Sequence, residues 1–292
     1  MTVHRSASPS GVLTIVYTLS TLPSSEGLDI DSTNFCHEPT LTTSVEDLQA
    51  HHKWFTTPGE TPLTSPAIIV QDDFYNPEEL AHVQGLAESS SYTEYWPRQQ
   101  GEPWQWNSSC LYVSTGKLLS EAEAFEGKRY APDHLRKRFE VVTGESIDPE
   151  NWEGIKRMDG KIREVIAGDG WNGVFHRFNS RWVGGAVHHH WKTPDVAPRG
   201  WSGVVFLGGE EANTCTTIWQ ERNTSLCVGR YGSDFEGLPL RRFNLAYAVQ
   251  AKVNRLVLFR EGVFHRAEVG SDQPFRSTQT FFFLTKEHKH EL

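Results

Sequence analysis

The pattern of apolar and polar positions changes character near residue 66. Residues 1–65 are rich in Ser, Thr and Pro and show little sustained periodicity, so we expect an irregular arm there. From Pro66 onward, regular strand-like and helix-like patterns follow one another without an internal repeat. The chain is therefore predicted to consist of an N-terminal arm over 1–65 and one domain over 66–292.

The first part of this domain carries one short strand pattern and two helical patterns. The run 67–70 predicts a strand, and a helix is expected to begin at Pro77, where Asn76 can cap the free N–H groups. A second helix fits 131–144, because its apolar residues recur at spacings of four and three and Gly144 can end it. These helices are expected to flank the core.

From residue 171 onward the pattern becomes β-like. Seven short runs are rich in Val, Phe, Trp and Thr and are separated by Gly, Pro and Asn, and no helical pattern intervenes. The runs are NGVFHRF (172–178), GGAVHHHW (184–191), WSGVVFLGG (201–209), TTIWQ (216–220), FNLAYAVQ (243–250), NRLVLFRE (254–261) and STQTFFFLT (277–285). This content predicts an α+β chain that is mainly β, with a sandwich or barrel of mostly antiparallel strands.

Charge and composition restrict the class of partner. The net charge is −9 and there is no long Lys/Arg run, which argues against binding of nucleic acid or an anionic membrane. No apolar run is long enough to span a bilayer. The four cysteines lack CxxC spacing, so we expect reduced thiols. A small-molecule substrate is the expected partner, and the sequence carries no signal for an oligomeric state.

Two short stretches bear on the cellular location. The run GVLTIVYTL (11–19) could be the apolar core of a secretory signal, and the C-terminal KHEL resembles an endoplasmic-reticulum retention sequence. The first stretch is equally well a β-strand, and the second is equally well a charged tail. We expect a cytoplasmic protein.

Three adjacent histidines provide the first candidate metal ligands. In a strand, side chains alternate between faces, so His188 and His190 point one way and His189 points the other. Neutral imidazole binds iron, zinc and copper, and the outer pair supplies two ligands. A third ligand is expected from His265, which follows the apolar strand 256–259 and a turn.

A lone arginine at the head of an apolar strand suggests a buried anion. Arg276 begins the run that continues as STQTFFFLT, and a guanidinium can hold a carboxylate through two hydrogen bonds. The alternative is an ion pair with Glu261 or Glu268.

This order of motifs resembles the 2-oxoglutarate/Fe(II)-dependent dioxygenases, and most closely their prolyl-hydroxylase-like branch. The stretch IIVQDDFYNPEEL is similar to the opening strand, DDF turn and helix of that branch, and the runs from WSGVVFLGG to FRSTQTFFF are similar to its core strands. The resemblance covers residues 66–285 motif by motif. It implies a double-stranded β-helix (jelly-roll or cupin-like) core that oxidises a substrate C–H bond with Fe(II), 2-oxoglutarate and O2. It also implies iron ligands at His188, His190 and His265, with Arg276 and Thr278 holding 2-oxoglutarate.

The chain departs from this family at one ligand. The family has Asp or Glu two residues after the first histidine, whereas this chain has His190. Asp195 could substitute as a carboxylate ligand, and His189 could replace a neighbour if the strand register slips by one. The neutral ligand set leaves two alternatives open: a cupin-like three-histidine dioxygenase that does not use 2-oxoglutarate, and a non-catalytic β-helix binding protein.

Overall fold

The computed structural model describes thirteen segments of the chain. They are residues 16–18, 41–43, 68–94, 106–108, 118–124, 128–153, 155–165, 172–179, 187–190, 200–208, 214–227, 240–268 and 275–286. Asp195 and the KHEL tail lie outside them, as does most of the predicted arm.

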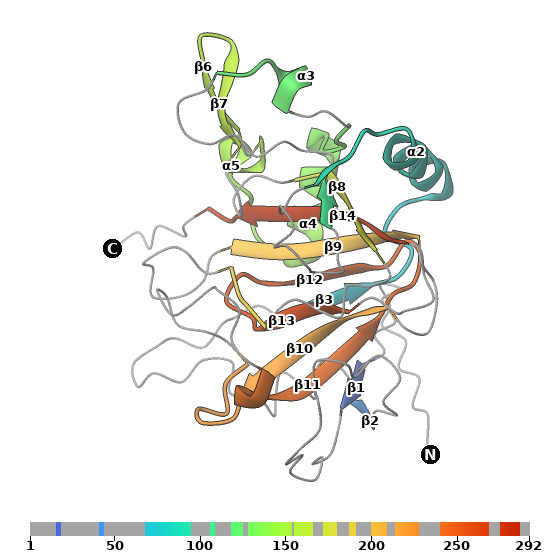
Figure 1. Cartoon of the computed structure of the whole chain (residues 1–292), viewed down its shortest axis with the longest axis vertical. Helices are drawn as coiled ribbons and strands as arrows, with labels where there is room; N and C mark the ends of the chain where they lie inside the picture. The colour runs from blue at the N-terminus through green and yellow to red at the C-terminus, as the bar shows by residue number, and fades with distance from the viewer. Residues whose placement is uncertain are drawn as a thin grey trace.

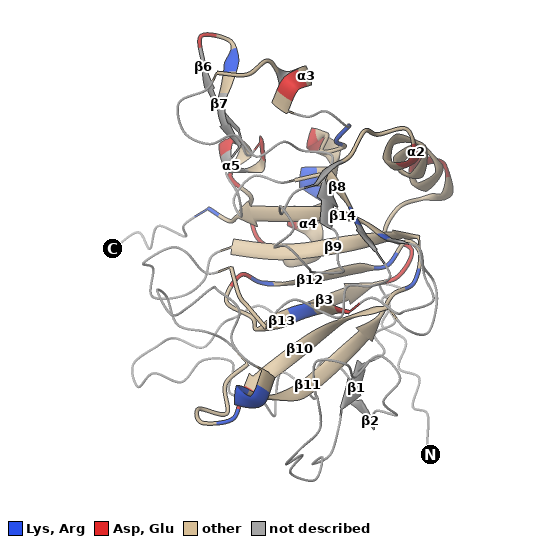
Figure 2. Ribbon diagram, in the orientation of Figure 1, with Lys and Arg blue, Asp and Glu red and all other residues tan. Residues whose placement is uncertain are grey.

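The larger of two main sheets has seven antiparallel strands in the order β3-β12-β9-β14-β8-β5-β4. Their bounds are β3 (Ile68–Gln71), β4 (Thr93–Glu94), β5 (Trp106–Ser108), β8 (Val174–Asn179), β9 (Gly200–Gly208), β12 (Leu256–Arg260) and β14 (Phe275–Leu284). Strands β14, β9, β12 and β3 run side by side across the middle of Figure 1. Strand β9 carries no charged residue (Figure 2), as expected for a strand that is covered on both faces.

The smaller sheet has the order β11-β10-β13, with β10 (Cys215–Glu221), β11 (Phe243–Gln250) and β13 (His265–Glu268). One apolar cluster joins the two sheets: it contains Phe206 and Val257 from the larger sheet and Ile218, Tyr247 and Val249 from the smaller one. The two sheets therefore face each other across a common interior. The prediction of a mainly β, double-stranded β-helix core is confirmed.

Shorter elements complete the described part of the chain. Strands β1 (Val16–Thr18) and β2 (Leu41–Thr43) pair with each other, and β1 lies beside β11 (Figure 1). The others are α3 (Glu121–Ala124), the hairpin of β6 (Ile155–Met158) and β7 (Lys161–Val165), and the 3-10 helix η3 (Leu240–Arg242). The division at residue 65 stays a prediction.

Helices α2 (Pro77–Glu88), α4 (Asp133–Thr143) and α5 (Pro149–Glu153) belong to the flank of the larger sheet. As predicted, α2 begins at Pro77, and the Asn76 side chain accepts a hydrogen bond from the Glu79 N–H at 2.9 Å. Helix α4 ends at Gly144, whose φ of 71° is the left-handed conformation that glycine adopts without strain. Both predicted helices are confirmed.

The helices pack on the face of the larger sheet that points away from β10 and β11. Phe139 of α4 is fully buried, and its ring lies 4.7 Å from that of Phe281 and 5.2 Å from that of Phe283. These residues of β14 alternate with the interior-facing residues of the same strand. The outer core thereby fixes β14, the strand that carries Arg276.

Truncating Phe139 should measure the contribution of this outer core. We expect Phe139→Ala to lower the free energy of unfolding by about 3–5 kcal/mol, because it removes a large buried ring and leaves a cavity. Val141 on the same helix is 84% exposed, so Val141→Ala serves as the control and should change stability by less than about 0.5 kcal/mol. Denaturant titration of both variants checks this. Equal effects would show that α4 does not pack as described.

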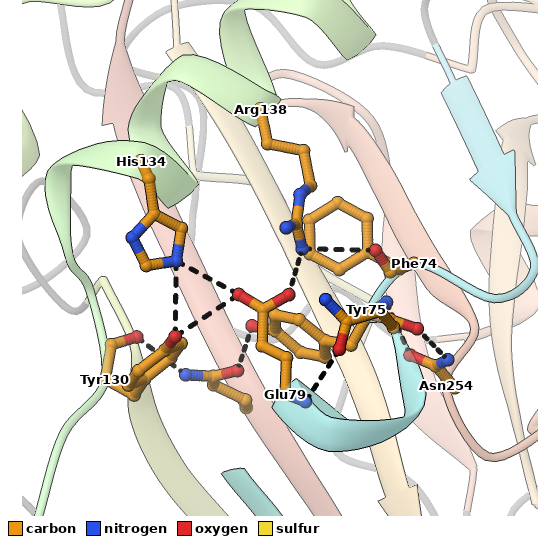
Figure 3. A network of polar contacts seen from close by, with 9 residues as sticks. Phe74, Tyr75, Glu79, Tyr130, His134, Arg138 and Asn254 are labelled. Atoms are coloured by element: carbon orange, nitrogen blue, oxygen red, sulfur yellow. Dashed lines mark hydrogen bonds and ion pairs between the residues drawn. The ribbon is translucent and has the colours of Figure 1, made fainter. Parts of the chain in front are cut away.

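A polar network joins the same helices to β14 (Figure 3). Glu79 of α2 accepts hydrogen bonds from Arg138 at 2.7 Å and from the Tyr130 hydroxyl at 3.2 Å. The Tyr75 hydroxyl donates to the Gln279 side chain at 2.6 Å, and Gln279 in turn donates to the Tyr130 carbonyl at 2.8 Å. Gln279 lies between Thr278 and Thr280 on β14, so the network anchors this strand from outside.

The network should make stability depend on pH. Burial alone would raise the pKa of Glu79, but hydrogen bonds from Arg138 and His134 outweigh it, so the pKa is lowered from the ordinary value of 4.5. A lowered pKa contributes stability above the unfolded value, and this stability is lost as pH falls through the folded value. Glu79→Gln should therefore lower the free energy of unfolding by its full amount at pH 7, and by a smaller amount as the pH falls below about 4.5. Glu78→Gln, exposed in the same helical turn, is the control. An effect of Glu79→Gln that does not vary with pH would contradict this role.

The state of the cysteines and the presence of membrane-spanning helices can be compared with the predictions. Cys227 is a buried free thiol, but Cys215 is disulfide-bonded, so the prediction of reduced thiols is wrong for Cys215. Among the described residues, no helix is long and apolar enough to cross a membrane.

Candidate metal centre

Two histidines of one short segment meet a third, which lies 75 residues beyond His190, in the interior. His188, His190 and His265 place one ring nitrogen each within 4.8 Å of the other two. The Nε2 atoms of His190 and His265 are 3.1 Å apart. Imidazole nitrogens that bind one ion at about 2.1 Å are separated by about 3–4 Å, so the three rings are arranged to share a metal ion.

Backbone pairing explains how these rings meet. His188 and His265 form an antiparallel bridge, with N–H to carbonyl distances of 3.1 and 2.9 Å. The His190 N–H donates to the Glu261 carbonyl at 2.6 Å, which continues the pairing around the turn after β12. Directly paired residues point to the same side of a sheet, so His188 and His265 face the same space.

His189 points the other way, as the alternation predicts. Its ring is buried and lies 5.5 Å from that of Phe264, in an edge contact. It does not take part in the three-histidine cluster. The alternative in which His189 replaces a neighbour is not supported by this register.

A main-chain carbonyl sets the chemical form of His265. The Nδ1 atom lies 2.8 Å from the Val263 carbonyl oxygen, so Nδ1 carries the proton and donates it in this hydrogen bond. Burial, with help from the nearby His188, holds the pKa of His265 well below its usual value. The ring is therefore neutral, and Nε2 offers its lone pair to a metal. The role of Val263 could not be predicted from the sequence, because every residue type has a main-chain carbonyl.

Aromatic rings surround the buried side of the cluster. The Phe259 ring lies 4.2 Å from that of His265, and the Phe282 ring lies 5.0 Å from that of His190. His265 is buried, whereas His188 and His190 are half-buried. Among the described residues, the half-buried pair therefore forms the more exposed side of the cluster.

Arg276 occupies the same interior, at the start of β14. Its Nη1 donates to the Cys215 carbonyl at 3.0 Å, its Nη2 donates to the Thr216 hydroxyl at 3.1 Å, and its guanidinium lies 4.8 Å from the Phe206 ring centre. Burial lowers the pKa of Arg276 to about 9, partly offset by the charge of Glu268, so the side chain stays charged at pH 7. Arg276 also contributes to lowering the pKa of His265, which places its charge within range of the cluster.

The predicted alternative for Arg276 was an ion pair with a glutamate. Glu268 forms its ion pair with Arg266, at 3.1 Å, and its main-chain carbonyl lies 3.5 Å from Arg276 Nη1. Burial raises the pKa of Glu268 to about 7, although the charges of Arg266 and Arg276 oppose this. The carboxylate that acts on Arg276 is therefore already engaged by another arginine.

Thr278 lies on the same face of β14 as Arg276. It is fully buried, and its hydroxyl has no hydrogen-bond partner in the described part of the chain. A buried hydroxyl without a partner costs about 1–3 kcal/mol, unless a ligand or water satisfies it. The pair of Arg276 and Thr278 thus fits an anionic ligand with two acceptor oxygens.

No protein-family model matches the chain, and neither does any curated protein. Solved structures that it resembles include a non-haem α-ketoglutarate-dependent epimerase of nogalamycin biosynthesis, with 12% identity, a TM-score of 0.45, and coverage of 82% of this chain and 83% of that one. An N-substituted L-amino acid dioxygenase from Burkholderia ambifaria AMMD, in complex with α-ketoglutarate, has 12% identity, a TM-score of 0.39, and coverage of 85% and 92%. A Pseudomonas putida prolyl-4-hydroxylase has 14% identity, a TM-score of 0.35, and coverage of 83% and 97%. These likenesses are remote, because the three identities are 14% or lower and the three TM-scores lie below 0.5.

Proposed function

We propose that the chain is a non-haem Fe(II) enzyme that uses 2-oxoglutarate and O2 to oxidise a C–H bond of a small molecule. One observation carries this proposal: the three-histidine cluster and the buried Arg276 share the interior of one double-stranded β-helix. Such an interior supplies both metal ligands and a site for an anionic co-substrate.

In this proposal His188, His190 and His265 hold the metal. All three ligands are neutral imidazoles, which suit Fe(II), and the Val263 carbonyl fixes the orientation of His265. Because no carboxylate of the described residues belongs to the cluster, these three ligands leave the full charge of the ion in place. A dianionic co-substrate that binds the metal would offset this charge.

Arg276 and Thr278 would hold the far carboxylate of 2-oxoglutarate. Arg276 offers charged donors, and the Thr278 hydroxyl is the orphaned group that a carboxylate oxygen would satisfy. When bound, Fe(II) and 2-oxoglutarate supply the oxidising chemistry: one oxygen atom of O2 enters succinate, with release of CO2, and the other enters the substrate as a hydroxyl group. The chain positions the co-substrate, while Phe259 and Phe282 exclude water from the buried side.

The experiment is to follow conversion of 2-oxoglutarate to succinate by mass spectrometry, with Fe(II) in air. Wild type should form succinate only when both iron and O2 are present. The variant His190→Asp, which introduces the acidic residue of the family pattern, should retain or raise this turnover. Succinate formation that is independent of iron would contradict the proposal.

A three-histidine dioxygenase that does not use 2-oxoglutarate is the second candidate. Two observations favour it: the third ligand is His190, and the donors of Arg276 already reach the Cys215 carbonyl and the Thr216 hydroxyl. This candidate predicts iron binding without consumption of 2-oxoglutarate, and His190→Asp should then reduce its activity.

The cytoplasmic location stays a prediction. The disulfide at Cys215 counts against it, since disulfides persist mainly in oxidising compartments.

A further inference from the structure

We propose that His176 is a specificity-determining residue that binds the distal carboxylate of the acid held by Arg276. This inference rests on the proposed function and extends it to a residue outside the motifs found in the sequence. The inference is based on the position of His176 in the sheet, which places it in one row with Thr278 and Phe206.

His176 lies beside the proposed anion site through strand register. On β8 it is fully buried and pairs directly with Thr278 of β14, and Thr278 pairs on its other side with Phe206 of β9. Residues directly opposite each other in antiparallel strands point to the same face, with their Cβ atoms about 5 Å apart. His176, Thr278 and Phe206 therefore form one row across three strands.

One end of this row contacts the guanidinium of Arg276. Phe206 at one end contacts Arg276, at 4.8 Å from the ring centre, and Thr278 in the middle carries the orphaned hydroxyl. A carboxylate that bridges Arg276 and Thr278 would consequently lie within reach of the imidazole of His176. Three kinds of donor would then surround it: a guanidinium, a hydroxyl and a ring N–H.

A neutral histidine suits this place better than a second cation. Burial lowers the pKa of His176 to about 3, so the ring is uncharged at physiological pH. A neutral imidazole still offers one N–H donor, yet it does not repel Arg276 or add another buried charge. His176 would thus discriminate in favour of acids with a second carboxylate at the far end of the chain.

The test compares two acids on the metal-loaded protein. 2-Oxoglutarate carries the distal carboxylate, whereas 2-oxopentanoate has the same carbon chain without it. Isothermal titration of the Ni(II)-loaded protein measures both affinities in wild type and in His176→Leu. We expect His176→Leu to weaken binding of 2-oxoglutarate about 10- to 100-fold, as for loss of a hydrogen bond to a charged group, and to leave 2-oxopentanoate almost unchanged.

Controls separate binding from folding. His176→Gln keeps a donor and should recover part of the preference for 2-oxoglutarate, which also provides a result if His176→Leu does not fold. His189→Gln replaces another buried histidine, one that packs on Phe264, and should leave the preference unchanged. Equal weakening of both acids by the His176 variants, or no weakening, would overturn this inference and leave the proposed function intact. Failure of wild type to bind 2-oxoglutarate would overturn the proposed function as well.

Discussion

Replacing His265 with alanine is expected to abolish tight metal binding. His265 is the most buried of the three candidate ligands, and both its backbone pairing with His188 and its bond to the Val263 carbonyl hold Nε2 toward the other two rings. Loss of a residue that merely orients a ligand costs about 10- to 100-fold in metal affinity, so loss of the ligand itself should cost more than about 100-fold. Anaerobic competition titration with Fe(II), together with metal analysis of the purified protein, measures this.

The matched control is His189→Ala. It removes a histidine of the same segment whose ring packs against Phe264 instead of joining the cluster. Metal content should stay at the wild-type level in this variant and fall in His188→Ala and His265→Ala. Loss of metal from His189→Ala, with retention in His188→Ala, would mean that the strand register is shifted by one residue.

Replacing Arg276 with leucine should have the second-largest effect. The variant removes the buried charge proposed to pair with the distal carboxylate, and breaking a buried pair costs about 3–5 kcal/mol, or roughly 150- to 5,000-fold in affinity for 2-oxoglutarate. Iron content should change little, because Arg276 is not one of the cluster residues. Calorimetric titration with 2-oxoglutarate and metal analysis of the same samples separate the two effects.

The exposed Arg241 of η3 provides the control for this change. Arg241→Leu removes the same charge from the surface and should alter neither iron content nor affinity for 2-oxoglutarate. Equal losses of iron and of 2-oxoglutarate binding in Arg276→Leu would indicate a structural role for Arg276 through its bonds to β10.

Sequence patterns over a few neighbouring residues correctly predicted the facing of the histidines and the ends of the helices. The alternation of a strand separated His188 and His190 from His189, and the cap at Asn76 and the stop at Gly144 located both helices. These outcomes depend on residues close together in the chain, where side-chain period and backbone conformation are determined by residue type.

Pairing between segments that lie far apart in the chain could not be predicted from the sequence. The short strand β13 was not predicted, although it carries His265 and pairs with β10. The Glu261 and Val263 carbonyls, which position His190 and His265, are common to every residue type. The position of His176 near the proposed anion site could not be predicted either. It lies beside Thr278 because strands about 100 residues apart in the sequence pair with each other.

The neutral ligand set has a direct chemical consequence. A site of three imidazoles balances none of the charge of Fe(II), so ligands that carry negative charge should bind it more favourably than at a site with a carboxylate ligand. The buried Arg276 adds a further positive charge to the same interior. Both features favour an anionic ligand at this centre, as the proposed use of 2-oxoglutarate requires.

Anaerobic titration with Fe(II), followed by 2-oxoglutarate, tests this account most directly. We predict that one equivalent of iron binds and that a weak visible charge-transfer band appears only after 2-oxoglutarate is added. Iron binding without this band would contradict the use of 2-oxoglutarate, and an absence of iron binding would contradict the metal centre itself.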